Sequence, residues 1–198
     1  MSGRLIAVVG PSGVGKDSLM AGLNAALPNS LLVQRVITRD PEAGGEDYVP
    51  VSEAEFAEMA ENGAFSIHWR AHGLAYGIPR TVQYQLNLGK DCLVNLSRSA
   101  LCHAARLFPD LVVLNITARP ETLARRLLGR GRETEAEIAQ RLSQADKELP
   151  VGMDIRHLSN DGPLVETVAR AVILLDPRAS VQDDAGESLA RASGGRRS

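Results

Sequence analysis

The chain has 198 residues, 44% of them apolar, and a formal net charge of −2. A chain of this length buries about 70% of its unfolded surface, so one α/β domain is stable without disulfides or structural metals. The small net charge excludes a general attraction to nucleic acid or to an anionic membrane. No apolar run approaches the ~20 residues of a membrane span. Any anionic ligand must therefore be bound by local geometry, and we expect neither nucleic acid nor membrane as a partner.

The cysteines and the N-terminus indicate the compartment. Cys92 and Cys102 lie in apolar surroundings and lack the spacing of a metal site or a redox motif. Such cysteines are typical of reduced thiols. The apolar run at residues 5–9 is too short for a secretory signal. We therefore expect a cytoplasmic protein.

The N-terminal segment predicts a strand, a glycine-rich loop and a helix. Residues 5–9 are a short apolar run with β-branched side chains, and residues 16–27 carry apolar side chains at helical spacing. Pro28 follows and ends the helix.

Later segments continue the alternation. Residues 92–96 and 111–117 are apolar runs typical of buried strands, whereas residues 120–129 and 135–149 have apolar side chains at i and i+4. Strands that alternate with helices predict a parallel sheet covered on both faces. We therefore expect an α/β fold.

Three segments depart from this pattern. Residues 35–85 are rich in glycine, aromatic and charged residues, which favours an insertion over a cleft. Residues 129–137 carry glycine, arginine and glutamate between two predicted helices. Small and polar residues dominate residues 177–198, so we expect a disordered tail. The pattern predicts one domain over residues 1–176.

The stretch "GPSGVGKDS" predicts a phosphate-binding loop. Gly10, Gly15 and Lys16 fit the pattern G-x-x-x-x-G-K, but Asp17 stands where serine or threonine is usual. Glycines let backbone N–H groups surround phosphate oxygens, and the lysine adds a positive charge. The predicted nucleotide-binding residues of this loop are Gly10, Pro11, Ser12, Gly13, Val14, Gly15, Lys16, Asp17 and Ser18.

Asp17 allows two interpretations. Its carboxylate could replace the usual hydroxyl as a ligand of Mg²⁺, which prefers oxygen donors. Alternatively, Asp17 caps the helix and interacts with its dipole, while Ser18 or water serves the metal. Both interpretations remain open on the sequence.

Six ordered motifs carry a family resemblance: "GPSGVGK", "VITRD", "DYVPVSEAEF", "AYG", "RLLGRGRETEAEIAQRL" and "SNDG". From about residue 4 to 175 the chain resembles the guanylate kinase superfamily of P-loop kinases. The resemblance implies a three-layer fold with a parallel core sheet, an acceptor-binding insertion over residues 35–85 and a short lid over residues 129–137. It implies closure over ATP and a phosphorylated acceptor.

The positions that bind guanine in guanylate kinases differ here. The resemblance places Glu42 where that family has a second arginine, and Ile67 where it has the guanine-reading glutamate. Asn95 and Ser97 replace carboxylates. Guanine's N–H donors would face the aliphatic chain of Ile67, and each buried unpaired polar group costs about 1–3 kcal/mol. We therefore expect weak GMP binding.

The motifs "GKDSL", "VSEAEF", "VNLSR", "RGRE" and "NDG", with the segment at residues 69–77, carry a second resemblance. They look like the ribose 1,5-bisphosphate phosphokinases of phosphonate breakdown, in which aspartate follows the loop lysine. This resemblance implies ATP-dependent phosphorylation of ribose 1,5-bisphosphate at its 1-phosphate. The products would be 5-phospho-α-D-ribose 1-diphosphate and ADP.

An acceptor that is already a phosphate is mostly a dianion at neutral pH, because its second pKa is about 6. The site must therefore supply cations and Mg²⁺ rather than a general base. We expect Lys16 to hold the transferred phosphoryl group. The resemblance implies that Arg130 and Arg141 close on it, with Arg126 and Arg132 as weaker candidates.

Arg39, Tyr48 and Tyr76 match acceptor-phosphate ligands of the superfamily. The candidates for the second phosphate, in segments that bind guanine elsewhere, are His68, Arg70, His72, Asn95, Ser97 and Arg98. We favour Arg98 as the 5-phosphate anchor, because a guanidinium binds a terminal phosphate through two hydrogen bonds. The histidines fit structural roles better. Asn160 matches a region near adenine, or belongs to a turn that needs no ligand.

Two other functions stay open at this point. One is a nucleoside monophosphate kinase, and the other is a non-catalytic guanylate-kinase-like binding module. Such a module needs no phosphate loop, so Lys16 and its glycines favour an enzyme.

Overall fold

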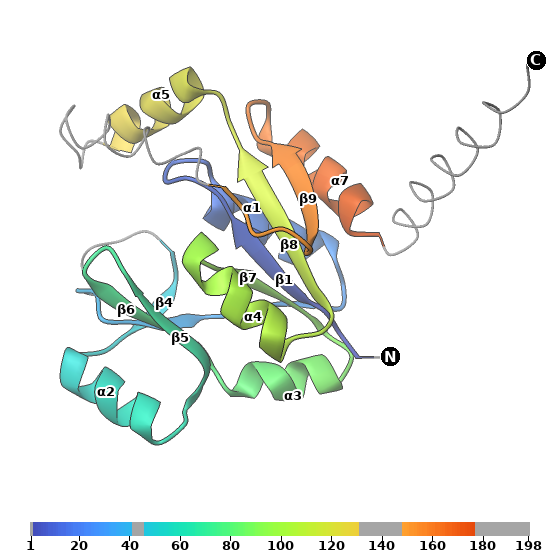
Figure 1. Ribbon diagram of the computed structural model, residues 1–198. Helices are drawn as coiled ribbons and strands as arrows, with labels where there is room; N and C mark the ends of the chain where they lie inside the picture. The colour runs from blue at the N-terminus through green and yellow to red at the C-terminus, as the bar shows by residue number, and fades with distance from the viewer. Residues whose placement is uncertain (1, 41–45, 131–147, 177–198) are drawn as a thin grey trace, which may run out of the picture.

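The computed structural model describes residues 2–40, 46–130 and 148–176, which form two sheets and their helices (Figure 1). The helix expected over residues 135–149, most of the predicted lid and the C-terminal tail lie outside these residues. The core sheet has the order β2-β7-β1-β8-β9, and all its strands are parallel. Its strands are β2 (Ser30–Leu32), β7 (Asp91–Asn95), β1 (Leu5–Val9), β8 (Leu111–Thr117) and β9 (Asp154–Ser159).

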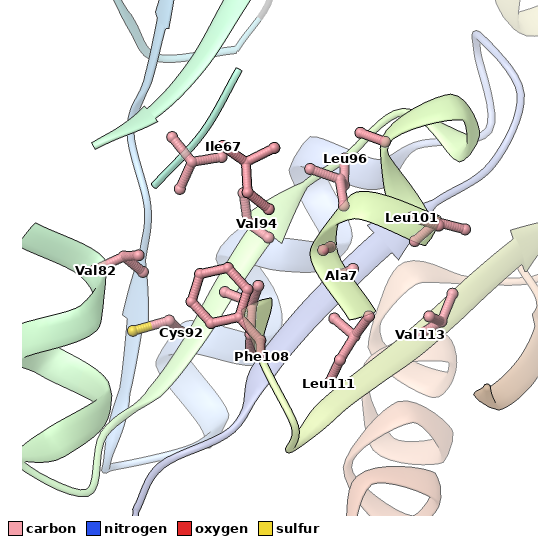
Figure 2. Packing of buried hydrophobic residues seen from close by; sticks show 14 of the residues in the cluster. Ala7, Ile67, Val82, Cys92, Val94, Leu96, Leu101, Phe108, Leu111 and Val113 are labelled. Carbon is pink, nitrogen blue, oxygen red and sulfur yellow. The ribbon is translucent and has the colours of Figure 1, made fainter. Parts of the chain in front are cut away.

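Helices cover both faces of the core sheet. On one face α1 (Lys16–Ala26) and α7 (Leu164–Leu175) pack on a cluster that includes Leu114. On the other, α3 (Thr81–Asn87) and α4 (Leu101–Leu107) pack on the cluster drawn in Figure 2. The expected α/β fold with a covered parallel sheet is confirmed.

The strong apolar runs are the elements that the sequence locates best. The strand at residues 111–117 is β8 with the same bounds, and the helix at residues 120–129 is α5 (Pro120–Arg130). β2, β9, α3, α4 and α7 are not among the predicted elements. β9 lies at the edge of the sheet and contains Arg156 and His157, so it lacks a continuous apolar run. No helix among the described residues is long and apolar enough to cross a bilayer.

A second sheet lies between β2 and α3 in the chain. It has the order β4-β3-β6-β5, with β4 (Tyr48–Pro50), β3 (Arg35–Ile37), β6 (Leu74–Pro79) and β5 (Phe65–Ala71). Helix α2 (Glu53–Glu61) packs against it and begins with a capping box between Ser52 and Glu55. This sheet falls within the predicted insertion at residues 35–85, whose role in acceptor binding stays a prediction.

The two sheets share side-chain contacts. Ile67 of β5 and Ile78 of β6 are buried in the same cluster as Val94 of β7. Figure 2 shows Ile67 beside Val94. Apolar packing therefore fixes the second sheet next to the carboxyl end of β7.

Candidate active site

The predicted phosphate loop connects β1 to α1 at the carboxyl edge of the core sheet (Figure 1). Gly10 has φ 152°, and a Cβ there would lie 2.4 Å from the carbonyl oxygen of Ile116. Gly15 is the N-cap of α1 with φ 91°, and its Cβ would lie 2.8 Å from Nδ2 of Asn160. The path of the loop therefore requires glycine at both positions.

Lys16 lies over its own loop. Its Nζ donates hydrogen bonds to the carbonyl oxygens of Gly10 at 3.0 Å and Pro11 at 3.2 Å. These contacts hold the ammonium at the N-terminus of α1, where a phosphate is also favoured by the helix dipole.

Charges from both sheets surround Lys16. Burial lowers the pKa of Lys16 to about 8. The charges of Arg35 and Arg98 also lower this pKa, whereas those of Asp17 and Glu46 raise it. An ammonium whose charge is partly destabilised by burial gains from a nearby polyphosphate, because the anion restores a favourable environment.

Two side chains, Asn160 and Arg126, donate hydrogen bonds to the backbone of the phosphate loop. The carbonyl oxygen of Val14 accepts hydrogen bonds from Asn160 Nδ2 at 2.7 Å and from Arg126 Nη1 at 3.2 Å. Arg126 Nη2 also donates to the carbonyl oxygen of Asn160 at 2.8 Å. Arg126, a weaker catalytic candidate on sequence, is thus placed as a positioning residue for the loop. The predicted role of Asn160 near adenine stays a prediction.

The turn after β9 has its own anchor. Asp161 Oδ1 accepts a hydrogen bond from the backbone N–H of Arg119 at 3.0 Å, and Oδ2 accepts one from Ser159 Oγ at 2.8 Å. The bond from Arg119 is the main cause that lowers the pKa of Asp161 to about 2. The ionised Asp161 therefore fixes the turn that carries Asn160.

Asp17 is exposed in the first turn of α1 and accepts a hydrogen bond from Asn95 Nδ2 at 3.3 Å. Since Gly15 occupies the N-cap, Asp17 is not the capping residue, although its charge still suits the helix dipole. The Asp17 carboxylate and the exposed Ser18 hydroxyl are hard oxygen donors, and Mg²⁺ needs only one or two such ligands beside nucleotide phosphates. These residues fit a Mg²⁺ site.

The second sheet contributes a buried arginine that the sequence analysis does not single out. Arg35 in β3 forms a two-bond ion pair with Glu46, and the side chains are 6% and 14% exposed. Its guanidinium carbon lies 5.0 Å from the ring centroid of Tyr76 and 6.0 Å from that of Trp69. In the sequence, Arg35 differs from its surroundings only as a charged residue directly before the apolar Val36 and Ile37, which complete the short strand.

Ser97, which follows β7, contacts one of the rings beside Arg35. Ser97 Oγ accepts a hydrogen bond from Trp69 Nε1 at 2.8 Å, and Arg98 begins the short 3₁₀ helix that follows. Trp69 also stacks on Tyr76 at 5.3 Å between ring centroids. The predicted acceptor residues Tyr76 and Ser97 are therefore brought together beside Arg35 and Trp69, and Arg98 follows Ser97 in the chain.

Other predicted acceptor residues lie further out. The guanidinium carbon of Arg39 lies 5.3 Å from the ring centroid of Tyr48. Arg39 also lines a pocket of about 450 Å³ beside the second sheet. Arg70 forms a largely exposed ion pair with Glu53. Ile67 is 1% exposed in the core, so it presents no acceptor to a base. Their predicted roles in binding stay predictions.

The predicted lid residues contribute no geometry. Arg130 ends α5, and its side chain is not described. Arg132, Arg141 and Glu42 lie outside the described residues.

Known proteins resemble this chain over nearly its whole length. The family model for guanylate kinase matches residues 2–160. The ribose 1,5-bisphosphate phosphokinase PhnN of Ruegeria sp. (strain TM1040) is 52% identical, covering 87% of this chain and 92% of that protein. The enzyme of the same name from Azotobacter vinelandii is 44% identical, covering 90% and 99%.

The solved structures agree on the fold. A guanylate kinase from Anaplasma phagocytophilum superposes with a TM-score of 0.64 at 22% identity, covering 87% of this chain and 85% of the other. At this identity the match bears on the fold alone.

Proposed function

Since this chain belongs to the guanylate kinase family, we propose that it transfers the γ-phosphoryl group of ATP to the 1-phosphate of ribose 1,5-bisphosphate. The products are 5-phospho-α-D-ribose 1-diphosphate and ADP. One observation carries the choice of acceptor: the high identity to ribose 1,5-bisphosphate phosphokinases across almost the full length of both chains. Both resemblances that the motifs indicate are thereby confirmed. The proposal includes a cytoplasmic role in phosphonate catabolism.

The described residues suit this reaction. An oxygen of the acceptor's 1-phosphate attacks the γ-phosphorus, and the bond from that phosphorus to the β–γ bridging oxygen breaks. ADP leaves with the electron pair, and no proton must be removed from a dianionic acceptor. Lys16, Arg98 and Arg35 supply the positive charge that the phosphate oxygens need. Mg²⁺, bound through Asp17 and Ser18, would neutralise further phosphate charge.

The site also supports an acceptor with two phosphates over GMP. Guanine needs hydrogen-bond acceptors for its N–H groups, and the structure has Ile67 in the apolar core at the matching position. Two arginines, Arg35 and Arg98, accompany the other acceptor candidates instead. A nucleoside monophosphate kinase remains the alternative.

One experiment separates the candidate functions. ADP release is measured with ATP and Mg²⁺ in the presence of ribose 1,5-bisphosphate, of GMP and of no acceptor. We expect turnover above background only with the bisphosphate, and a diphosphate product by ³¹P NMR. Folded protein that phosphorylates GMP instead supports the alternative, and one that phosphorylates neither supports a binding module.

A further inference from the structure

The Arg35–Glu46 pair is an unusual feature of the second sheet. Arg35 lies in a strand whose other residues, Val36 and Ile37, are buried and apolar. A buried ion pair costs desolvation on both partners, and apolar residues of similar size often stabilise a fold as well or better. A charge retained at such a position calls for an explanation other than stability.

The surroundings hold the guanidinium in one orientation. Glu46 accepts from Nε and Nη2, so Nη1 lies outside the pair. The rings of Tyr76 and Trp69 lie within cation–π distance of the guanidinium carbon. Trp69 is itself held by its hydrogen bond to Ser97. A guanidinium fixed in this way loses little freedom when it binds an oxyanion.

Arg35 also shares its region with two other cations. Hydrogen bonds place this region beside the phosphate loop. Asn95 at the end of β7 donates to Asp17 in α1 at 3.3 Å. Ser97 accepts from Trp69, whose ring lies beside Arg35. Besides burial, the charges of Arg35 and Arg98 accordingly lower the pKa of Lys16. Asp17 and Glu46 offset part of this positive charge, and an anionic ligand offsets more of it. Lys16 belongs to the phosphate loop, whereas Arg35 belongs to the second sheet, where we expect the acceptor to bind.

We propose that Arg35 binds the non-reacting 5-phosphate of the acceptor, with Glu46, Tyr76 and Trp69 holding its guanidinium in place. The inference rests on the proposed function and extends it, because the sequence analysis favours Arg98 alone for this role. Arg35 makes the site specific for a sugar bisphosphate, since an acceptor without the second phosphate lacks a charged hydrogen bond to this guanidinium.

The test compares Arg35→Met with Arg80→Met, which removes an exposed arginine directly after the β6 strand. We expect Arg35→Met to raise the acceptor KM about 10- to 100-fold, since a hydrogen bond to a charged group is lost. The KM for ATP in Arg35→Met, and both KM values of Arg80→Met, should stay within about twofold of wild type. An acceptor KM for folded Arg35→Met within twofold of wild type overturns the inference.

Arg35→Met leaves Glu46 buried without its partner, which destabilises the fold. Two further variants keep the inference testable if Arg35→Met does not fold. Arg35→Lys keeps the charge but not the two-bond geometry, and we expect a smaller rise in acceptor KM. Glu46→Gln keeps Arg35 but weakens the ion pair that orients it, so we expect an acceptor KM between those of wild type and Arg35→Met. If Arg35→Lys lowers only the melting temperature and kcat, with the acceptor KM unchanged, Arg35 is structural and the inference fails.

Calorimetric titration with ribose 5-phosphate distinguishes this inference from the proposed function. That probe carries the 5-phosphate and no 1-phosphate. Binding to wild type that weakens at least tenfold in Arg35→Met supports the inference, even if ribose 1,5-bisphosphate is not turned over. Turnover of the bisphosphate with equal ribose 5-phosphate affinities in both proteins overturns the inference and leaves the function standing. A wild type that neither binds nor turns over contradicts both.

Discussion

The two sheets of this protein differ in whether backbone groups or side chains form the proposed binding site. The core sheet has five parallel strands with buried apolar faces, and its functional groups lie in the loops at its carboxyl edge. The second sheet is smaller and mixed, and it carries a charge and two stacked rings within its strands. In the proposed function, the core sheet presents backbone groups to the nucleotide, whereas the second sheet presents side chains to the acceptor.

This difference teaches where specificity can change. A loop that binds phosphate through its backbone tolerates few changes in path, because Gly10 and Gly15 contact neighbouring atoms too closely to accept a side chain. A side chain in a strand, such as Arg35, can be exchanged while the strand remains. Variants that affect one sheet and not the other would test this division.

Lys16→Ala should reduce kcat about 10³-fold, because the charge on the transferred phosphoryl group loses its nearest cation. Lys90→Ala, a change outside the loop, should leave kcat within twofold. The measurement is ADP release at saturating substrates, with the melting temperature as a check on folding. A Lys16→Ala enzyme with wild-type turnover would remove this residue from the mechanism.

Leu114→Ala should lower the free energy of unfolding by about 2–5 kcal/mol, since it leaves a cavity in a fully buried part of the core sheet. Urea denaturation gives the value. At urea concentrations below the unfolding transition the acceptor KM should not change, because the cluster around Leu114 lies on the face of the core sheet away from the second sheet. A large rise in that KM would break the proposed division.

The titration of Lys16 should limit activity at high pH. Its pKa of about 8 lies below the usual 10.5, so the free enzyme loses this charge above pH 8. We expect kcat/KM for ATP to fall about tenfold per pH unit beyond that point. Stability behaves oppositely: between about pH 8 and 10.5 the unfolded chain binds more protons, so this group adds stability as pH rises. A flat kcat/KM profile to pH 9.5 would contradict the assignment.

Arg126→Met should raise the KM for ATP about tenfold, because Val14 and Asn160 each lose a hydrogen bond that fixes the phosphate loop. Arg125→Met is the matched control, since Arg125 is exposed on the same helix. The acceptor KM should stay unchanged. Equal ATP constants for the two variants would show that the loop keeps its path without Arg126.

Asp17→Ser tests whether Asp17 is a ligand of Mg²⁺, and it has the smallest expected effect. We expect the Mg²⁺ concentration for half-maximal activity to rise about threefold, because a hydroxyl replaces a charged ligand. Asp110→Ser, at the opposite end of the core sheet, serves as the control. An unchanged Mg²⁺ requirement would count against Asp17 as a metal ligand.

The sequence predicts the core sheet better than the acceptor side, for a physical reason. Buried parallel strands and glycine loops leave local patterns, so β1, β8 and the loop at Lys16 are recognised directly. The contacts of Arg35 with Glu46 and with the rings join segments separated in the chain, and no spacing encodes them. Edge strand β9 escapes prediction because its charged residues interrupt the apolar run.

Trp69 is the only tryptophan of the chain, and it lies at the junction of the two sheets. Its indole touches Ser97 after β7 through a hydrogen bond, stacks on Tyr76 and lies near Arg35. The protein therefore carries an intrinsic optical probe at the proposed acceptor site. We expect its emission, followed by stopped-flow, to report the arrival of the acceptor in real time and without a chemical label.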